Sequence, residues 1–369
     1  MIYLDNAATS FPKPKNVISE IARCLTSYCG NPGRSSHILS LRSSEAIYDT
    51  RVQISSLFKS GKPENVVFTY NATYALNIAI KTAVRPGDHV IISDLEHNSV
   101  LRPLEALKEK SGINYSVFNS DLSLSEEIGR LKKDNTKVLI STLRSNVTGQ
   151  KIDLNELEMV AKKHSLKLIL DASQSAGHEV IDLTNKAYYA LCAPAHKALL
   201  GIQGSGFIIF GSDEYKPTFI EGGSGAESLK KDMPNDLPER FEAGTQNVPA
   251  IVALKEGISY INSIGINNIE QIIRQNESYF LERLFELPKT KLYHGGGIIS
   301  LICDDISPSN LSNYLDKRQI CTRSGLHCAP LAHKKIATDN YGTLRISIGI
   351  FNTKRDADAL YSTLSELIK

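Results

Sequence analysis

The sequence predicts an α/β protein with a large, mostly parallel sheet and a smaller α+β domain at its carboxyl end. The first half alternates short apolar segments with amphipathic segments of helical length, which is typical of βαβ units. A stretch at about 222–238, rich in Gly, Pro and charge, breaks this alternation and predicts a long surface loop. The 369 residues suit two domains better than one small module. In such a fold, functional residues gather at the carboxyl ends of the parallel strands.

Each element of the first half has a local signal. Short runs rich in Val, Ile, Leu and Phe predict buried strands, and the spacing of apolar residues between them predicts helices. The expected strands are 66–69, 89–92, 137–142, 166–170 and 206–210. The expected helices are about 73–83, 99–110 and 153–163. The last of these begins at Asp153, with Glu156 at the spacing of a capping box.

The second half predicts a different arrangement. Helical stretches precede a glycine-interrupted strand pair, and further strands lead to a final helix. The expected helices are about 250–264, 267–287 and 354–368, and the expected strands are 292–303, 320–323 and 344–348. We therefore expect a large domain at 15–250 and a small domain at 251–369, joined by the N-terminal segment 1–14.

Composition excludes several classes of protein. With 42 Lys and Arg against 40 Asp and Glu, the net charge of +2 argues against nucleic-acid binding. No apolar run is long enough to span a membrane, and the first ten residues do not resemble a signal peptide, so we expect a cytosolic protein. The six cysteines lack paired zinc-ribbon spacing and are too sparse for a disulfide scaffold, so we expect most to be reduced thiols.

Lys197 and Asp171 carry the main chemical signal. Asp171 ends a predicted strand, and Lys197 follows on a loop after one more helix and strand. This order suits pyridoxal 5′-phosphate (PLP), because a lysine amine forms a Schiff base with its aldehyde and a carboxylate keeps its pyridine nitrogen protonated. For Lys197 alone, an ordinary surface position is the better interpretation. The glycine-rich run at 201–206 favours close approach to a ligand.

Nine short motifs in order resemble one family along nearly the whole chain. They are YLDNAATS (3–10), NATYALN (71–77), LEHNSV (95–100), RSNVTG (144–149), DASQSAGH (171–178), AHKALLGIQGSG (195–206), FEAGTQN (241–247), RSGLHCAP (323–330) and TLRISIGIFNT (343–353). The chain resembles the class V aminotransferase-fold PLP enzymes, specifically the cysteine desulfurase and selenocysteine lyase branch. This resemblance implies the PLP-dependent transferase fold of type I and a homodimer.

The resemblance also implies a role for each matching residue. Lys197 binds the cofactor, and Asp171 supports it. His97 stacks on the cofactor ring and transfers protons. The remaining cofactor contacts are Ala72, Thr73 and His196 at the phosphate, Gln174 at the phenolic oxygen, Asn146, and Thr245 at the phosphate held by the partner subunit. Asn146 and Arg345 hold the substrate carboxylate, a task that suits the planar fork of arginine.

Cys328 is the residue that distinguishes a cysteine desulfurase from the other activities of this fold. A partly exposed cysteine near cationic groups tends to be reactive. The resemblance implies that Cys328 takes the sulfur of L-cysteine as a persulfide, releases L-alanine, and passes the sulfur to an acceptor protein or thiol. The short segment from Cys328 to Arg345 resembles the group II branch. A zinc site of Cys321, His327, Cys328 and His333 ranks low, because adjacent ligands are poorly spaced, and we expect no metal.

Departures from the family pattern leave alternatives open. Pro194 stands where many group II members have a phosphate-binding serine, and Asn98 stands where many have a second histidine. Selenocysteine lyase, another PLP-dependent C–S lyase and a class V aminotransferase remain candidate activities. The remaining alternative is a protein of this fold that binds PLP or a partner without catalytic turnover. Pro194 is the only residue that supports it.

Overall fold

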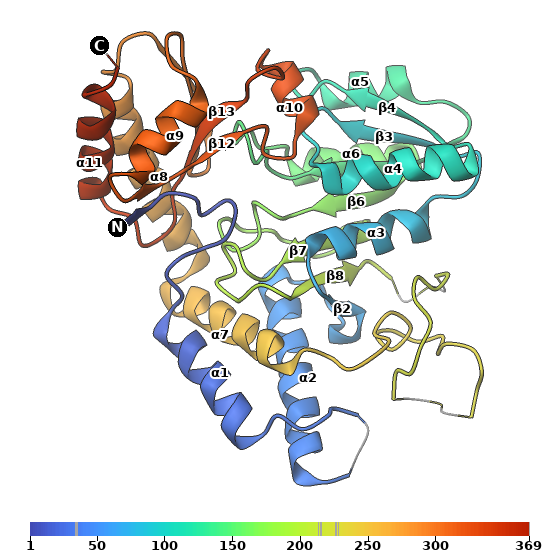
Figure 1. The fold of residues 1–369 in the computed structure, drawn as a ribbon. Coiled ribbons are helices and arrows are strands. Elements are labelled where there is room, and N and C mark those ends of the chain that lie inside the picture. The colour runs from blue at the N-terminus through green and yellow to red at the C-terminus, as the bar shows by residue number, and fades with distance from the viewer. Residues whose placement is uncertain (34–35, 213, 215, 226, 228, 369) are drawn as a thin grey trace.

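A seven-stranded sheet forms the centre of the computed structural model, which describes residues 1–33, 36–212, 214, 216–225, 227 and 229–368 (Figure 1). Its strands, in spatial order, are β2 (Val66–Thr69), β8 (Gly206–Phe210), β7 (Ala190–Pro194), β6 (Lys167–Asp171), β5 (Thr136–Thr142), β3 (His89–Ser93) and β4 (Asn114–Phe118). The β2–β8 and β7–β8 pairs are antiparallel and the other pairs are parallel. The α/β class with a mainly parallel sheet is confirmed.

Helices cover both faces of this sheet, which explains why its strands are apolar without alternation. Val90 and Ile92 of β3 pack on one face, with α3 (Ala72–Ala83) and α4 (Asn98–Ser111). Ile91 packs on the opposite face. The helices of that second face are α2 (Ile38–Phe58), α5 (Leu124–Leu131), α6 (Leu154–Lys163) and α7 (Val248–Ile264).

A smaller antiparallel sheet lies in the carboxyl-terminal part. Its strands, in spatial order, are β12 (Arg323–Gly325), β13 (Thr343–Ser347), β10 (Ile298–Cys303) and β9 (Thr290–Gly295). Its core includes side chains from α8 (Ile266–Leu284), α9 (Pro308–Asp316) and α11 (Lys354–Ser365). The helix α10 (Pro330–Lys335) follows the loop that carries Cys328.

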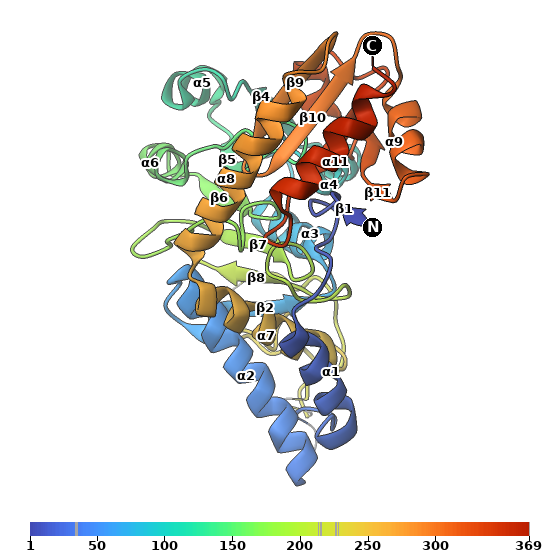
Figure 2. The same cartoon turned by 90° about the vertical axis from the view of Figure 1, so that its left-hand side faces the viewer.

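The N-terminal segment crosses between the two sheets, and Figure 2 shows it running from the small sheet down to α1. Its strand β1 (Ile2–Tyr3) pairs in parallel with β11 (Ile320–Cys321). Its helix α1 (Lys15–Ser27) then packs against α7. The predicted division at 250/251 falls inside α7. The division of the chain into two domains stays a prediction.

Several elements differ from the expectation. The helices α1, α2, α5, α9 and α10 and the strands β1 and β4 had no predicted counterpart. Asp153 caps α6 as expected, accepting the N–H groups of Asn155 and Glu156. The expected loop at 222–238 has neither helix nor strand in its described part, and Ala226 and Ser228 lie outside the described residues. Among the described residues, no helix is long and apolar enough to cross a membrane.

Candidate active site

The first turns of α3 and α4 meet at one end of the large sheet. Asn71 caps α3, and its side-chain oxygen accepts the N–H of Tyr74 at 2.9 Å. The N–H groups of Ala72 and Thr73 lie in the first turn and therefore have no partner within the helix. The hydroxyl oxygens of Thr73 and Ser99 lie 2.8 Å apart and join the two helix starts. This end carries the positive ends of two helix dipoles, which favours an anion.

His97 caps α4 as a neutral imidazole. Its Nδ1 accepts the backbone N–H of Ser99 at 3.0 Å, so the proton of the neutral ring is on Nε2. Burial lowers the pKa of His97 to about 4, although the nearby charge of Asp171 acts in the opposite direction. His97 therefore stays neutral through the physiological range, with one N–H to donate.

Asp171 ends β6, and Lys197 lies on the loop after the adjacent strand β7, and the described residues between the two strands lack the expected helix. Asp171 is the last residue of β6 and is opposite Cys192 of β7, whose chain continues to Lys197. Asp171 Oδ1 accepts the N–H of Ser173 at 2.9 Å. Burial lowers the pKa of the Lys197 amine to about 8, while Asp171 acts to raise it. About one tenth of this amine is therefore unprotonated at pH 7, far more than for an ordinary lysine.

One pocket brings together eight of the predicted site residues. They are Ala72, Thr73, His97, Asn146, Asp171, Gln174, His196 and Lys197. The Gln174 side-chain amide donates to the carbonyl of Ala7 at 3.1 Å, and the Nδ1 atom of His196 is buried without a hydrogen-bond partner in the described structure.

Arg345 lies outside the lining of this pocket. It is buried on β13, where one guanidinium nitrogen donates to Asp5 at 2.8 Å and another to the carbonyl of Asn146 at 3.2 Å. Its Nε atom has no partner in the described structure. Arg345 is thus joined to the pocket through Asn146, and it already pairs with a carboxylate of the chain.

Cys328 is exposed on the loop between β12 and α10. Its carbonyl accepts the N–H of Asn98 at 2.7 Å, and the preceding carbonyl of His327 accepts the side-chain amide of Asn146 at 2.8 Å. Cys328 lines a second pocket, which shares Thr73, His97 and Ser99 with the first. The loop is therefore fastened beside the pocket that contains Lys197.

Thr245 is exposed just before α7 and is not in the lining of the Lys197 pocket. Its expected contact is with a partner subunit, so it stays a prediction. In the described part of the chain, no group of three or more His, Cys, Asp and Glu residues is placed to hold a metal ion.

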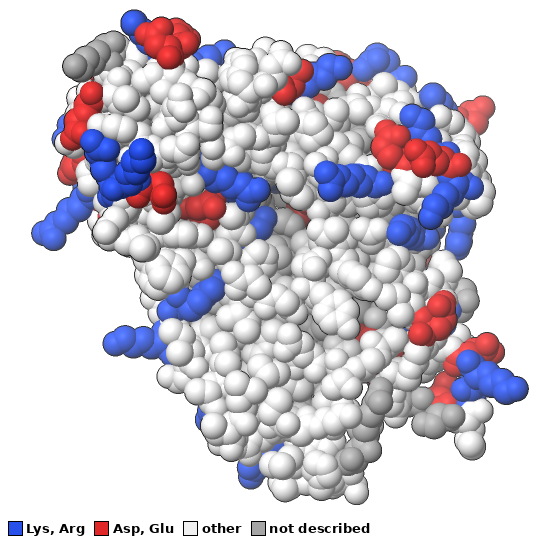
Figure 3. All heavy atoms as spheres, in the orientation of Figure 1, with Lys and Arg blue, Asp and Glu red and all other residues white. Residues whose placement is uncertain are grey.

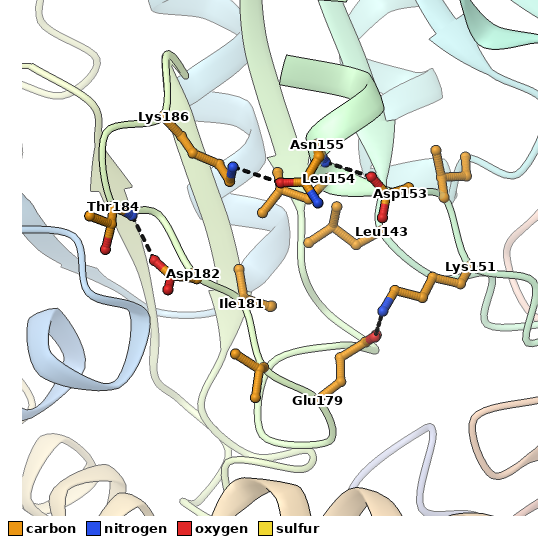
Figure 4. Close-up of a pocket in the computed structure, with 12 residues that line it drawn as sticks. Leu143, Lys151, Asp153, Leu154, Asn155, Glu179, Ile181, Asp182, Thr184 and Lys186 are labelled. Atoms are coloured by element: carbon orange, nitrogen blue, oxygen red, sulfur yellow. Dashed lines mark hydrogen bonds and ion pairs between the residues drawn. The ribbon is translucent and has the colours of Figure 1, made fainter. Parts of the chain in front are cut away.

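Sequence reasoning gave no role to Asp5, Ser99 or Arg144. All three residues lie within recognised motifs, at 3–10, 95–100 and 144–149, and this position was the signal that could have identified them. Arg144 lines the Lys197 pocket and donates to Glu179 at 3.0 Å. Figure 4 shows Glu179 on a separate pocket, where its carboxylate points to Lys151 at 2.5 Å. Arg144 and Lys151 therefore balance the charge of Glu179. As a result, Glu179 gives the neighbouring pocket no unpaired carboxylate.

Comparison with known proteins identifies the family. The sequence model of the Aminotransferase class-V family matches residues 2–360. The chain belongs to this family. A probable cysteine desulfurase of Methanothermobacter thermautotrophicus is 30% identical over 380 residues, covering 99% of this chain and 94% of the relative. A probable cysteine desulfurase of Pyrococcus abyssi is 29% identical, covering 100% and 94%. The family indicated by the nine motifs is confirmed.

Solved structures of similar fold support this membership. The apo cysteine desulfurase of Thermococcus onnurineus is 27% identical to this class-V chain, with a TM-score of 0.91 and coverage of 100% of this chain and 94% of the other. The cysteine desulfurase CsdA of Escherichia coli is 24% identical, with a TM-score of 0.90 and coverage of 100% and 95%. At that identity, CsdA shows the fold alone.

Proposed function

We propose that this chain is a PLP-dependent cysteine desulfurase that converts L-cysteine to L-alanine and keeps the sulfur as a persulfide on Cys328. The observation that carries the proposal is the position of Cys328. This exposed thiol lines a pocket that shares His97 and Thr73 with the pocket of Lys197. A transaminase would give this cysteine no task. The curated relatives named above support the same activity.

The residues of the Lys197 pocket fit PLP. The free N–H groups of Ala72 and Thr73 suit a phosphate, and the unpartnered Nδ1 of His196 lies in the same pocket. The Lys197 amine has its pKa lowered to about 8, mainly by burial, which favours the nucleophilic form. Asp171 supplies the carboxylate for a pyridine nitrogen. When bound, PLP acts as an electron sink for the carbanion formed at the substrate Cα.

Proton transfers fall to two residues of the chain. Lys197, partly neutral near pH 7, takes the proton from the substrate Cα. His97 holds a proton on Nε2 and lies between the two pockets, so it is placed to exchange a proton with the substrate side chain. We assign the substrate carboxylate to Asn146 and Arg345.

Sulfur transfer is the task of Cys328. Its thiolate attacks the substrate sulfur, and the bond between that sulfur and the substrate Cβ breaks. The electron pair of the broken bond stays with the substrate carbon, which is protonated to give L-alanine. Overall, L-cysteine and the Cys328 thiol give L-alanine and the Cys328 persulfide, so that all atoms balance. A thiol or a protein acceptor then removes the outer sulfur.

We also propose that the chain works as a homodimer in the cytosol. Exposed apolar residues follow one face of α2 at helical spacing, namely Ile38, Leu41, Tyr48 and Val52. Figure 2 shows α1 and α2 projecting from the body of the molecule. Such a face favours burial against a second copy, which would receive Thr245 at its own phosphate site. All six cysteines are free thiols, which suits a reducing compartment.

Alanine and sulfide release tests the activity. Wild-type protein loaded with PLP is given L-cysteine and dithiothreitol, beside Cys328→Ala and the matched control Cys29→Ala, which removes another exposed thiol. We expect equal amounts of alanine and sulfide from wild type and control, and neither from Cys328→Ala. Turnover by Cys328→Ala contradicts the persulfide route. Turnover of selenocysteine but not of cysteine by wild type would replace the proposed substrate.

A further inference from the structure

A groove beside the Lys197 pocket opens at Cys328. It lies along α3 and α4, whose first turns are joined by the contact between Thr73 and Ser99. Its volume is about 320 Å³, at the lower end of the range for small-molecule sites. Cys328 stands at the N-terminal end of α4, where its carbonyl accepts the N–H of Asn98. The groove therefore offers a molecule that takes sulfur from Cys328 a bound position beside the thiol.

The lining of the groove carries positive charge alone. Its described residues include Lys81 and Arg102 but no Asp or Glu. Both cations are exposed, and neither has an ion pair among the described residues. Lys81 instead lies 5.2 Å from the ring centre of Phe219. The nearby carboxylate of Glu105 on α4 forms an ion pair with Lys108 at 3.7 Å, not with Arg102.

The charge of Arg102 reaches the catalytic pocket. Burial is the main cause of the low pKa of His97. The charges of Lys197, Arg323 and Arg102 also act to lower that pKa. Arg323 is exposed on β12, opposite Arg345 of β13. Whereas Arg345 is neutralised by Asp5, Arg323 and Arg102 face no such partner in the described structure. Figure 3 shows Lys and Arg side chains on the face over α3 and α4, together with a cluster of Asp and Glu side chains over α4.

We propose that this groove binds an anionic sulfur acceptor, namely a small thiol that carries carboxylate groups near its sulfur. The proposal rests on the persulfide function proposed for Cys328. The acceptor thiolate attacks the outer sulfur of the persulfide, and the bond between that sulfur and Cys328 Sγ breaks. The electron pair returns to Cys328 as thiolate, and the acceptor leaves as a persulfide. Lys81 and Arg102 raise the local concentration of the anion and offset its repulsion from the thiolate.

Alkylation of the resting thiol tests the charge preference without turnover. PLP-loaded protein is treated with iodoacetate, an anion, or with iodoacetamide, which is neutral, and modification of Cys328 is followed by mass spectrometry. The ratio of the iodoacetate rate to the iodoacetamide rate at Cys328 is compared with the same ratio for 2-mercaptoethanol, which is the reference thiol. We expect the ratio at Cys328 to exceed the reference by about tenfold at low salt and to fall towards it at high salt.

Charge reversal identifies the residues responsible. Lys81→Glu/Arg102→Glu should bring the alkylation ratio at or below the reference, whereas Lys110→Glu, an exposed site at the far end of α4, should keep it high. A ratio equal to the reference in wild type, or the same fall in Lys110→Glu, overturns the proposal. Slow modification by both reagents that speeds up on dilution shows a second copy in the groove and also overturns it.

The acceptor step separates this inference from the proposed function. Alanine formed in the first turnover reports the desulfurase reaction, and persulfide release to mercaptosuccinate, 2-mercaptoethanol or cysteamine reports the groove. We expect release to be fastest with the dianionic mercaptosuccinate and slowest with the cationic cysteamine. Normal alanine formation with equal rates for all three thiols overturns the groove proposal alone. Absence of alanine overturns the desulfurase function, whatever the alkylation ratio.

Discussion

Asp5 and Arg345 form an ion pair in which a carboxylate oxygen of Asp5 lies 2.8 Å from a guanidinium nitrogen of Arg345. The side chain of Arg345 is 2% exposed and that of Asp5 is 20% exposed. Tyr3 supports the segment, because its hydroxyl donates to the carbonyls of Asp5 and Thr9. The N-terminal segment thus fixes the guanidinium that we assign to the substrate carboxylate.

Loss of the Asp5 charge should destabilise the protein through Arg345. We expect Asp5→Asn to lower the free energy of unfolding by about 1–3 kcal/mol, since it leaves a buried guanidinium without its counter-charge. Arg345→Gln in the Asp5→Asn background should cost clearly less than in wild type. Urea unfolding of the four proteins of this double-mutant cycle measures the coupling. Strictly additive losses would show that the ion pair contributes nothing.

Lys13 extends the same segment to the loop of Lys197. Its amine donates to the carbonyl of His196 at 2.8 Å and to the hydroxyl of Ser10 at 2.7 Å, while the Ser10 hydroxyl donates to the carbonyl of Lys197 at 2.8 Å. Burial lowers the pKa of Lys13 to about 8. The segment therefore contacts both Arg345 and the main chain beside the proposed cofactor lysine.

Removal of the Lys13 amine should weaken PLP retention. Lys13→Met keeps the length of the side chain but loses the hydrogen bond to His196, and about 1 kcal/mol corresponds to roughly fivefold weaker binding. Equilibrium dialysis followed by absorbance of the bound cofactor measures this change. Lys15→Met, at an exposed site in the first turn of α1, is the matched control. Equal retention by wild type and both variants would contradict a role for Lys13 in holding the loop.

Local pattern was sufficient for most strands of the large sheet and for Asp171 and Lys197, whereas the other residues of the pocket came from the family resemblance. Buried strands such as β3 and β6 are continuous apolar runs, and residues at parallel strand ends must meet at one edge. The helix α2 escaped prediction because it places Ile38, Tyr48 and Val52 towards solvent, which blurs the contrast between its faces. The contact between Asp5 and Arg345 joins residues 340 positions apart, so no local pattern encodes it.

Glu96 is a buried carboxyl beside the active site. One of its oxygens accepts the backbone N–H of Thr142 at 2.7 Å and the hydroxyl of Ser93, and the other has no partner in the described structure. Burial is the main cause that raises the pKa of Glu96 to about 8, with the charge of Asp171 acting in the same direction and the hydrogen bonds acting against it. The side chain is therefore mostly protonated at pH 7 in the folded protein.

This raised pKa makes stability fall as pH rises. Below the ordinary pKa of glutamate, Glu96 is protonated in both states and carries no penalty. Between that value and about 8, the folded protein binds more protons than the unfolded chain, so the free energy of unfolding decreases with increasing pH. Glu96→Gln keeps the acceptor for Thr142 and removes the titration. We expect its stability advantage over wild type to be smallest at pH 5.5 and to grow by roughly 2–4 kcal/mol by pH 8.5.

Urea unfolding of PLP-loaded wild type and Glu96→Gln at pH 5.5, 7 and 8.5 measures this difference. The other titrating groups are common to both proteins, so the pH dependence of the difference reports Glu96. Glu109→Gln, on the exposed surface of α4, controls for the loss of one carboxylate and should follow wild type at every pH. A constant difference between wild type and Glu96→Gln would show that Glu96 has the same pKa in both states. Its partnerless oxygen would then have to be solvated despite its burial.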